Sequence, residues 1–119
     1  MARSNKPLIW LPFAAGGTLA AFLLPAVVLV PLLASLNILP AEKILAYERL
    51  LATLSHPLTK IILFIGLGLP LWHAAHRLRM TLQDLGVRGT QARRLIAWLC
   101  YGTAGIATFL FLYALGAIT

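Results

Sequence analysis

Apolar residues form three long runs separated by short polar segments. No charged residue lies within residues 8–39, 61–72 or 95–118. A helix rises about 1.5 Å per residue, so about 20 residues cross a hydrocarbon core near 30 Å thick. With the flanks of the second run included, the pattern predicts transmembrane helices at residues 8–39, 58–80 and 95–118. We expect a single-domain, all-α membrane protein over residues 1–119.

Composition agrees with this prediction, since 61% of the 119 residues are hydrophobic and 11% are charged. Soluble domains need roughly a quarter charged residues. The formal charge of +7 does not indicate a nucleic-acid partner, because the Lys and Arg residues cluster at the ends of the apolar runs. The bilayer surface is their expected partner. The first run far exceeds the ~7–15 apolar residues of a signal peptide, so we interpret it as an uncleaved span.

Cationic residues are distributed unequally between the two sides of the predicted bundle. Seven lie at the N-terminus and around the second loop: Arg3, Lys6, Arg77, Arg79, Arg88, Arg93 and Arg94. Three lie on the other side: Lys43, Arg49 and Lys60. Positive residues favour the cytoplasmic side. The N-terminus and second loop are therefore expected in the cytoplasm, with the first loop and C-terminus outside, in a bacterial inner membrane.

The two loops differ in character. In the first, Ile44, Leu45 and Tyr47 are expected to share one side of a short interfacial helix. The second, residues 81–94, is polar and contains glycines suited to chain reversal.

Catalysis by this chain alone is not expected. The carboxylates Glu42, Glu48 and Asp84 all lie outside the predicted mid-membrane region, where proton-coupled transporters need an ionisable group. The sequence has no Gly-rich phosphate loop, Cys-x-x-Cys pair or Ser/His/Asp constellation. These absences disfavour an enzyme and a small homo-oligomeric transporter, although the transporter is kept as an alternative from a different class.

Polar and aromatic residues gather at the end of the second span, where Trp72, His73, His76 and Arg77 lie within six residues. Positions three and four apart are neighbours on a helix surface. Imidazole passes a proton near neutral pH, which suits quinol chemistry. The alternative is that Trp72 belongs to the aromatic belt and Arg77 anchors to lipid phosphates.

A second cluster lies at the start of the first span. Trp10, Phe13 and Gly17 are spaced i, i+3 and i+7, so they share one helix face, at the membrane depth expected for His76. An aromatic wall opposite polar donors would suit a flat quinone headgroup. Taken separately, the aromatic residues would be belt residues and the glycine a helix-packing site.

Haem and metal sites are not expected. His73 and His76 are too close on one helix to bind one iron from both faces, and His56 is at the opposite membrane surface.

Several short motifs together resemble those of the small hydrophobic membrane anchor of bacterial quinol:fumarate reductase. They are W-x-x-F-x-A-G-G from Trp10 to Gly17, Tyr47-Glu48-Arg49, L-P-L-W-x-x-x-H-R from Leu69 to Arg77, and Asp84-Leu85. Their order and spacing cover nearly the whole chain.

The resemblance implies a four-subunit enzyme of anaerobic respiration. A flavoprotein with FAD reduces fumarate, an iron–sulfur subunit relays electrons, and two anchors hold them at the membrane and help form a menaquinol site. By matching position, Trp10, Phe13, His76 and Arg77 would line the quinone pocket, with Gly17 packed nearby. Anchors of this type carry no haem.

This chain departs from the family pattern after the His-Arg pair. It has Arg79, Met80 and Gln83 where the family is richer in histidine, and His73 where a different residue is expected. No role is assigned to His73. A succinate dehydrogenase anchor is the alternative within the same class.

Overall fold

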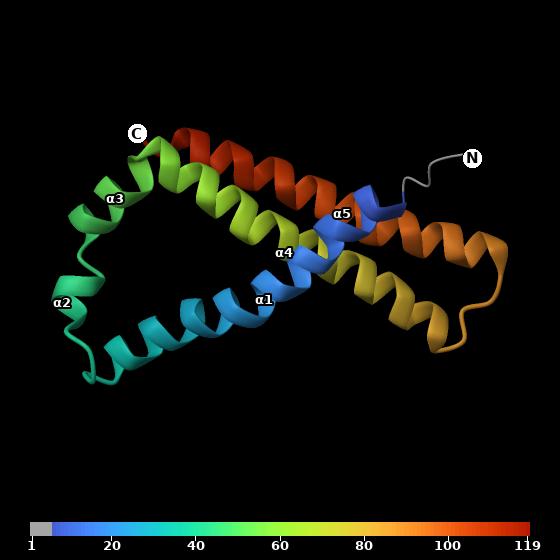
Figure 1. Cartoon of the computed structure of the whole chain (residues 1–119), viewed down its shortest axis with the longest axis horizontal. Helices are drawn as coiled ribbons and strands as arrows, with labels where there is room; N and C mark the ends of the chain where they lie inside the picture. The colour runs from blue at the N-terminus through green and yellow to red at the C-terminus, as the bar shows by residue number, and fades with distance from the viewer. Residues whose placement is uncertain (1–5) are drawn as a thin grey trace.

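The computed structural model describes residues 6–119, so Arg3, which contributed to the charge asymmetry above, lies outside the described residues. The described residues form helices joined by short connections, with no strand among them (Figure 1). The helices are α1 (Lys6–Ser35), α2 (Ala41–Ile44), α3 (Tyr47–Ser55), α4 (Pro57–Asp84) and α5 (Thr90–Ala117). The prediction of an all-α protein is confirmed.

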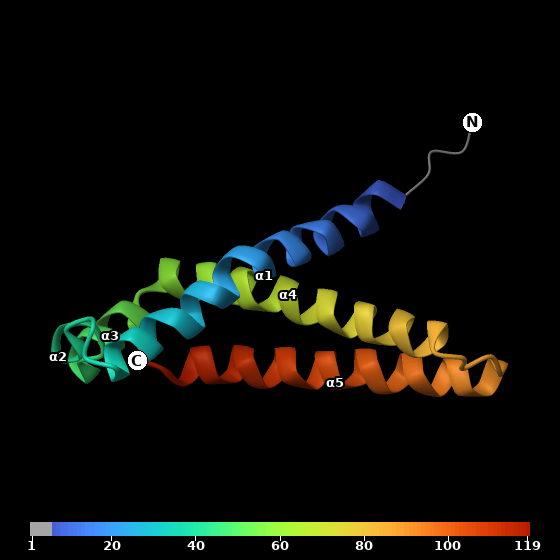
Figure 2. The same cartoon turned by 90° about the horizontal axis from the view of Figure 1, so that it is seen from below.

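Helices α1, α4 and α5 are each long and apolar enough to cross a membrane, as the sequence predicted. They run antiparallel in chain order, with α1 packed on α4 and α4 packed on α5 (Figures 1 and 2). The start of α1 and the turn between α4 and α5 lie at one end of the molecule. The C-terminus and the short helices α2 and α3 lie at the other end.

Specific residues mark the boundaries of the long helices. Asn37 adopts a left-handed conformation with φ of 58°, and the N–H of Ile38 bonds the carbonyl of Leu33, which terminates α1. At the start of α4, the Nδ1 atom of His56 accepts from the N–H of Leu58 at 3.2 Å. The α4–α5 turn contains Gly86 with φ of +112°, a conformation that favours glycine.

The helix ends differ from the predicted span ends. Helix α1 stops at Ser35, α4 continues to Asp84, and α5 begins at Thr90. The second loop is therefore shorter than residues 81–94, because polar residues extend both helices past their apolar runs.

The prediction of one interfacial helix between the first two spans is wrong. The segment forms two helices, α2 and α3, and Leu45 lies between them. The backbone of Ala46 has φ of −58° and ψ of 123°, which is incompatible with a continuous helix.

The buried core is small and consists of small side chains. Among the described residues, the buried hydrophobic side chains are Ala34, Ala75, Cys100, Ala104 and Leu115. Large apolar side chains face outward, for example Phe22 at 77% and Phe109 at 69% exposure. Helices that are apolar on nearly all sides are stable only when lipid or other helices surround them.

The backbones of α1 and α4 lie close together at Gly16. A Cβ atom on Gly16 would lie 2.9 Å from the backbone carbonyl carbon of Leu69 and 2.9 Å from the Cβ of His73. Neither obstacle is a flexible side-chain end, so a side chain at this position would force the helices apart.

We therefore expect Gly16→Ala to destabilise the bundle by about 1–3 kcal/mol, the usual cost of overpacking. Thermal unfolding of the detergent-solubilised chain, followed by circular dichroism, measures the effect. Gly68→Ala is the matched control, since its Cβ would meet no atom within 4 Å. Equal melting temperatures for the two variants would contradict this account of the α1–α4 contact.

Candidate functional site

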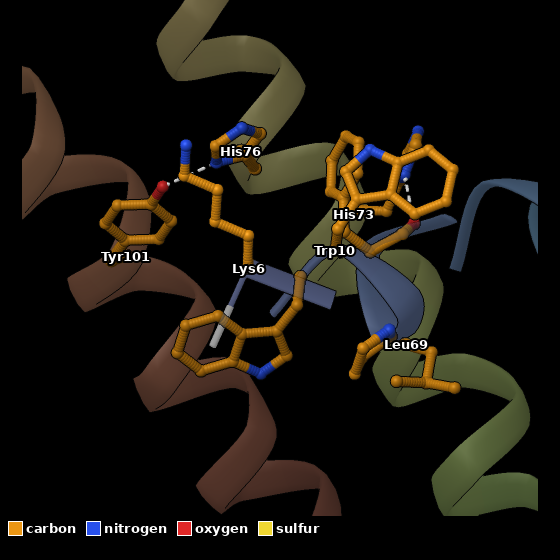
Figure 3. A pocket seen from close by; sticks show the side chains of 9 residues that line it. Lys6, Trp10, Leu69, His73, His76 and Tyr101 are labelled. Atoms are coloured by element: carbon orange, nitrogen blue, oxygen red, sulfur yellow. Dashed lines mark hydrogen bonds between the residues drawn. The ribbon is translucent and has the colours of Figure 1, made fainter. Parts of the chain in front are cut away.

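A cavity of about 640 Å³ lies where α1 meets α4 and α5 (Figure 3). All three long helices contribute to its wall. The lining residues are Lys6, Trp10, Pro12 and Phe13 from α1, Leu69, Trp72, His73 and His76 from α4, and Tyr101 from α5. The surface that this wall exposes is mostly apolar and carries a small number of polar atoms, which is typical of a site for a small organic ligand.

Phe13 is the aromatic centre of this wall. Its ring stacks on the imidazole of His73, with centroids 4.4 Å apart and an interplanar angle of 21°. The imidazole of His76 meets the same ring edge-on, at 4.7 Å and 69°. Phe13 belongs to α1 and both histidines belong to α4, so these contacts join the start of α1 to α4.

His73 is attached to α1 by a hydrogen bond as well as by stacking. Its Nδ1 atom lies 2.8 Å from the carbonyl oxygen of Phe13. A carbonyl can only accept, so Nδ1 carries the hydrogen and donates. The ring occupies the space left by the missing side chain of Gly17, where a Cβ would lie 2.6 Å from Cε1 of His73.

His76 is hydrogen-bonded to the third helix. Its Nδ1 atom lies 2.7 Å from the hydroxyl oxygen of Tyr101, to which Nη1 of Arg79 also donates at 3.1 Å. The guanidinium carbon of Arg79 is 5.5 Å from the centre of the Tyr101 ring. A polar network thus connects α4 and α5 beside the cavity.

The two tryptophans of the wall differ in their attachments. Trp10 is 66% exposed and borders the cavity from α1 (Figure 3). Trp72 donates from its indole nitrogen to the hydroxyl of Thr108 at 3.0 Å and stacks at 6.1 Å on the ring of Tyr101. Trp72 is therefore held by α5, whereas the indole of Trp10 has a large surface available to a ligand, lipid or partner.

The residues predicted from sequence are not all in one place. Trp10, Phe13 and His76 line the cavity together, and Gly17 packs behind it against His73. Arg77 does not line the cavity: it is exposed and has no hydrogen bond or ion pair with the described residues. Successive helix positions are about 100° apart, so the neighbour of an inward-facing histidine faces elsewhere.

Sequence reasoning assigned no site role to His73 or Tyr101, and both line the cavity. His73 lies three positions before His76, which places the two side chains side by side on α4. Tyr101 has no local signal. Counting outward from the α4–α5 turn in both directions would have placed it level with the two histidines.

The two histidines of this wall do not form a metal-binding cluster with Cys, Asp or Glu side chains of the described residues. Among residues 6–119, no three side chains of His, Cys, Asp or Glu come together in a way that could hold a metal ion.

Comparison with known proteins gives one consistent answer. Residues 1–116 match the family of the fumarate reductase D subunit. The fumarate reductase D subunit of Mycobacterium tuberculosis strain H37Rv is 40% identical over 103 residues, covering 86% of this chain and 79% of the relative. The Vibrio parahaemolyticus protein of the same name is 38% identical over 113 residues, covering 91% and 84%.

The fit between Gly17 and His73 can be tested by a double-mutant cycle. Gly17→Ala is expected to displace the His73 ring from Phe13 and lower stability by about 1–3 kcal/mol. In a His73→Ala background the same change should cost much less, because the space is then free. Thermal unfolding of the four proteins in detergent gives the coupling free energy. Additive effects would show that the ring does not occupy this space.

Proposed function

Since this chain belongs to the family of the fumarate reductase D subunit, we propose that it is a non-catalytic membrane anchor of quinol:fumarate reductase and contributes part of a menaquinol site. The observation that carries the second half of this proposal is the convergence of Trp10, Phe13 and His76 on one cavity. His76 belongs to α4 and is far in sequence from Trp10 and Phe13, which both belong to α1.

The cavity has the properties that a quinone headgroup requires. Phe13 and Trp10 supply flat apolar surfaces for a ring, and the imidazoles supply hydrogen-bonding nitrogens at its edge. Ligand sites of this kind commonly measure about 300–1,000 Å³, and the volume of about 640 Å³ falls in that range. Menaquinol, when bound, supplies two electrons and two protons.

This chain would contribute binding of the headgroup, and partner subunits would contribute the redox chemistry. Phe13 and Trp10 would orient the ring by apolar contact. His76 would hydrogen-bond an oxygen of the headgroup through its ring. FAD and iron–sulfur clusters would belong to the flavoprotein and iron–sulfur subunits.

We propose that a second hydrophobic anchor subunit packs against much of the outer surface of this three-helix bundle. A Cβ atom built on Gly102, Gly105 or Gly116 would meet no atom of this chain within 4 Å, so another helix can approach closely there. We propose no haem on this chain, because His73 and His76 are three residues apart on one helix and so cannot bind one iron from opposite faces.

We propose that the end of the bundle carrying the cavity faces the cytoplasm of a bacterial inner membrane. The start of α1 and the α4–α5 turn are at the same end. The N-terminal segment and the residues around that turn together contain seven of the ten Lys and Arg residues of the chain. The iron–sulfur subunit would dock on that side, so that electrons would travel only a short distance from a quinol in the cavity to that subunit.

His76→Ala and Trp10→Leu are expected to reduce menaquinol-driven fumarate reduction by about 10- to 100-fold, because each removes a contact with the headgroup. Activity of the membrane-bound complex with a soluble artificial donor should stay nearly unchanged. Trp98→Leu is the matched control, a 79% exposed tryptophan on α5 that does not line the cavity. Equal loss of both activities would indicate a role in assembly alone.

The proposed orientation is tested by reporter fusions. A periplasm-active reporter fused after Thr119 should be active, and the same reporter inserted after Gly89 in the α4–α5 turn should be inactive. A cytoplasm-active reporter should give the reverse pattern. A cytoplasmic C-terminus would refute the orientation.

A further inference from the structure

The hydroxyl of Tyr101 has two hydrogen-bonding neighbours that differ in what they can do. Nη1 of Arg79, 3.1 Å away, can only donate, so the tyrosine oxygen accepts from it. Nδ1 of His76 is 2.7 Å away. Lys6, which also lines the cavity, is a donor as well. Among the described residues, His76 is therefore the acceptor for the hydroxyl hydrogen of Tyr101.

This donor–acceptor order determines where the imidazole hydrogen lies. A neutral imidazole has one bare nitrogen and one N–H. If Nδ1 of His76 accepts from Tyr101, the hydrogen lies on Nε2. The alternative order, with His76 donating from Nδ1, would leave the tyrosine hydrogen without an acceptor in this part of the chain.

Arg79 holds the tyrosine in the required role. It lies three positions after His76 and so on the neighbouring part of the α4 surface. Its guanidinium carbon is 5.5 Å from the centre of the Tyr101 ring, and its Nη1 atom occupies an acceptor site of the hydroxyl. With that site occupied, the hydroxyl hydrogen is directed toward His76.

We propose that Tyr101, backed by Arg79, is a positioning residue that fixes His76 as the Nε2–H tautomer. In this form the nitrogen not engaged by Tyr101 is a hydrogen-bond donor, which can bond to an oxygen of a quinone or quinol headgroup. The tautomer follows from the contacts of this chain alone, whereas its use toward a quinone depends on the function proposed above.

His73 provides a built-in contrast, because its Nδ1 donates to the carbonyl oxygen of Phe13 at 2.8 Å. The two histidines, three residues apart on one helix, therefore hold opposite tautomers. His73 carries its hydrogen on Nδ1 and His76 on Nε2. An NMR spectrum that resolves both rings should therefore show one histidine in each tautomer.

The test is nitrogen NMR of the assembled complex, with histidine rings labelled with ¹⁵N and the signals assigned by loss in His73→Gln and His76→Gln. In the wild type, Nδ1 of His76 should show the shift of a bare nitrogen, and Nδ1 of His73 that of a protonated one. Tyr101→Phe should give His76 a mixture of tautomers and lower menaquinol-driven activity about 3- to 30-fold, with soluble-donor activity unchanged.

Tyr113→Phe is the matched control, because it removes a hydroxyl from the same helix at a position that is 72% exposed. It should change neither the tautomers nor the activity. Should Tyr101→Phe fail to assemble, Arg79→Met replaces it: this variant keeps the tyrosine, frees its hydroxyl to turn, and should also mix the tautomers.

A protonated Nδ1 on wild-type His76 would overturn the proposal, as would a single unchanged tautomer in Tyr101→Phe or, if that protein is not obtained, in Arg79→Met. Failure of the proposed function has a different signature. If the tautomer depends on Tyr101 but His76→Ala leaves menaquinol-driven activity intact, the positioning role stands and the quinol site is wrong.

Discussion

The close contact between α1 and α4 depends on two adjacent positions without side chains. Gly16 lets the backbone of α1 approach Leu69, and Gly17 leaves room for the imidazole of His73. Only at this separation can His73 reach the carbonyl of Phe13 and stack on its ring. The aromatic wall of the cavity is thus a consequence of backbone proximity, which attractive side-chain contacts alone would not produce.

Two threonine hydroxyls of α5 are satisfied within their own helix, as an apolar surrounding favours. The hydroxyls of Thr103 and Thr108 each donate to a carbonyl four residues earlier in α5. The oxygen of Thr108 in turn accepts from the indole of Trp72, which orients that ring beside the cavity. A hydrogen bond within α5 therefore also helps to position part of the candidate site.

The sequence predicted the long helices and part of the site for identifiable physical reasons. Uncharged runs mark spans directly, because a charge within the hydrocarbon core is costly. Periodicity on single helices indicated Trp10, Phe13 and His76, and these line one cavity. Helix ends were less predictable, since polar turns extend α4 and α5 beyond the apolar runs. Tyr101 was missed because its proximity to His76 arises from the antiparallel pairing of two helices, which local spacing does not encode.

The cavity draws on residues that emerge from the ribosome at very different times. About 90 residues separate Phe13 from Tyr101. At a synthesis rate of about 5–20 residues per second, the aromatic side chains of α1 are made roughly 5–20 seconds before those of α5. Until α4 arrives, lipid or the insertion machinery must cover the surface of α1 that later faces His73. Assembly of the pocket is therefore a late step of biogenesis, completed only when α5 leaves the translocation channel.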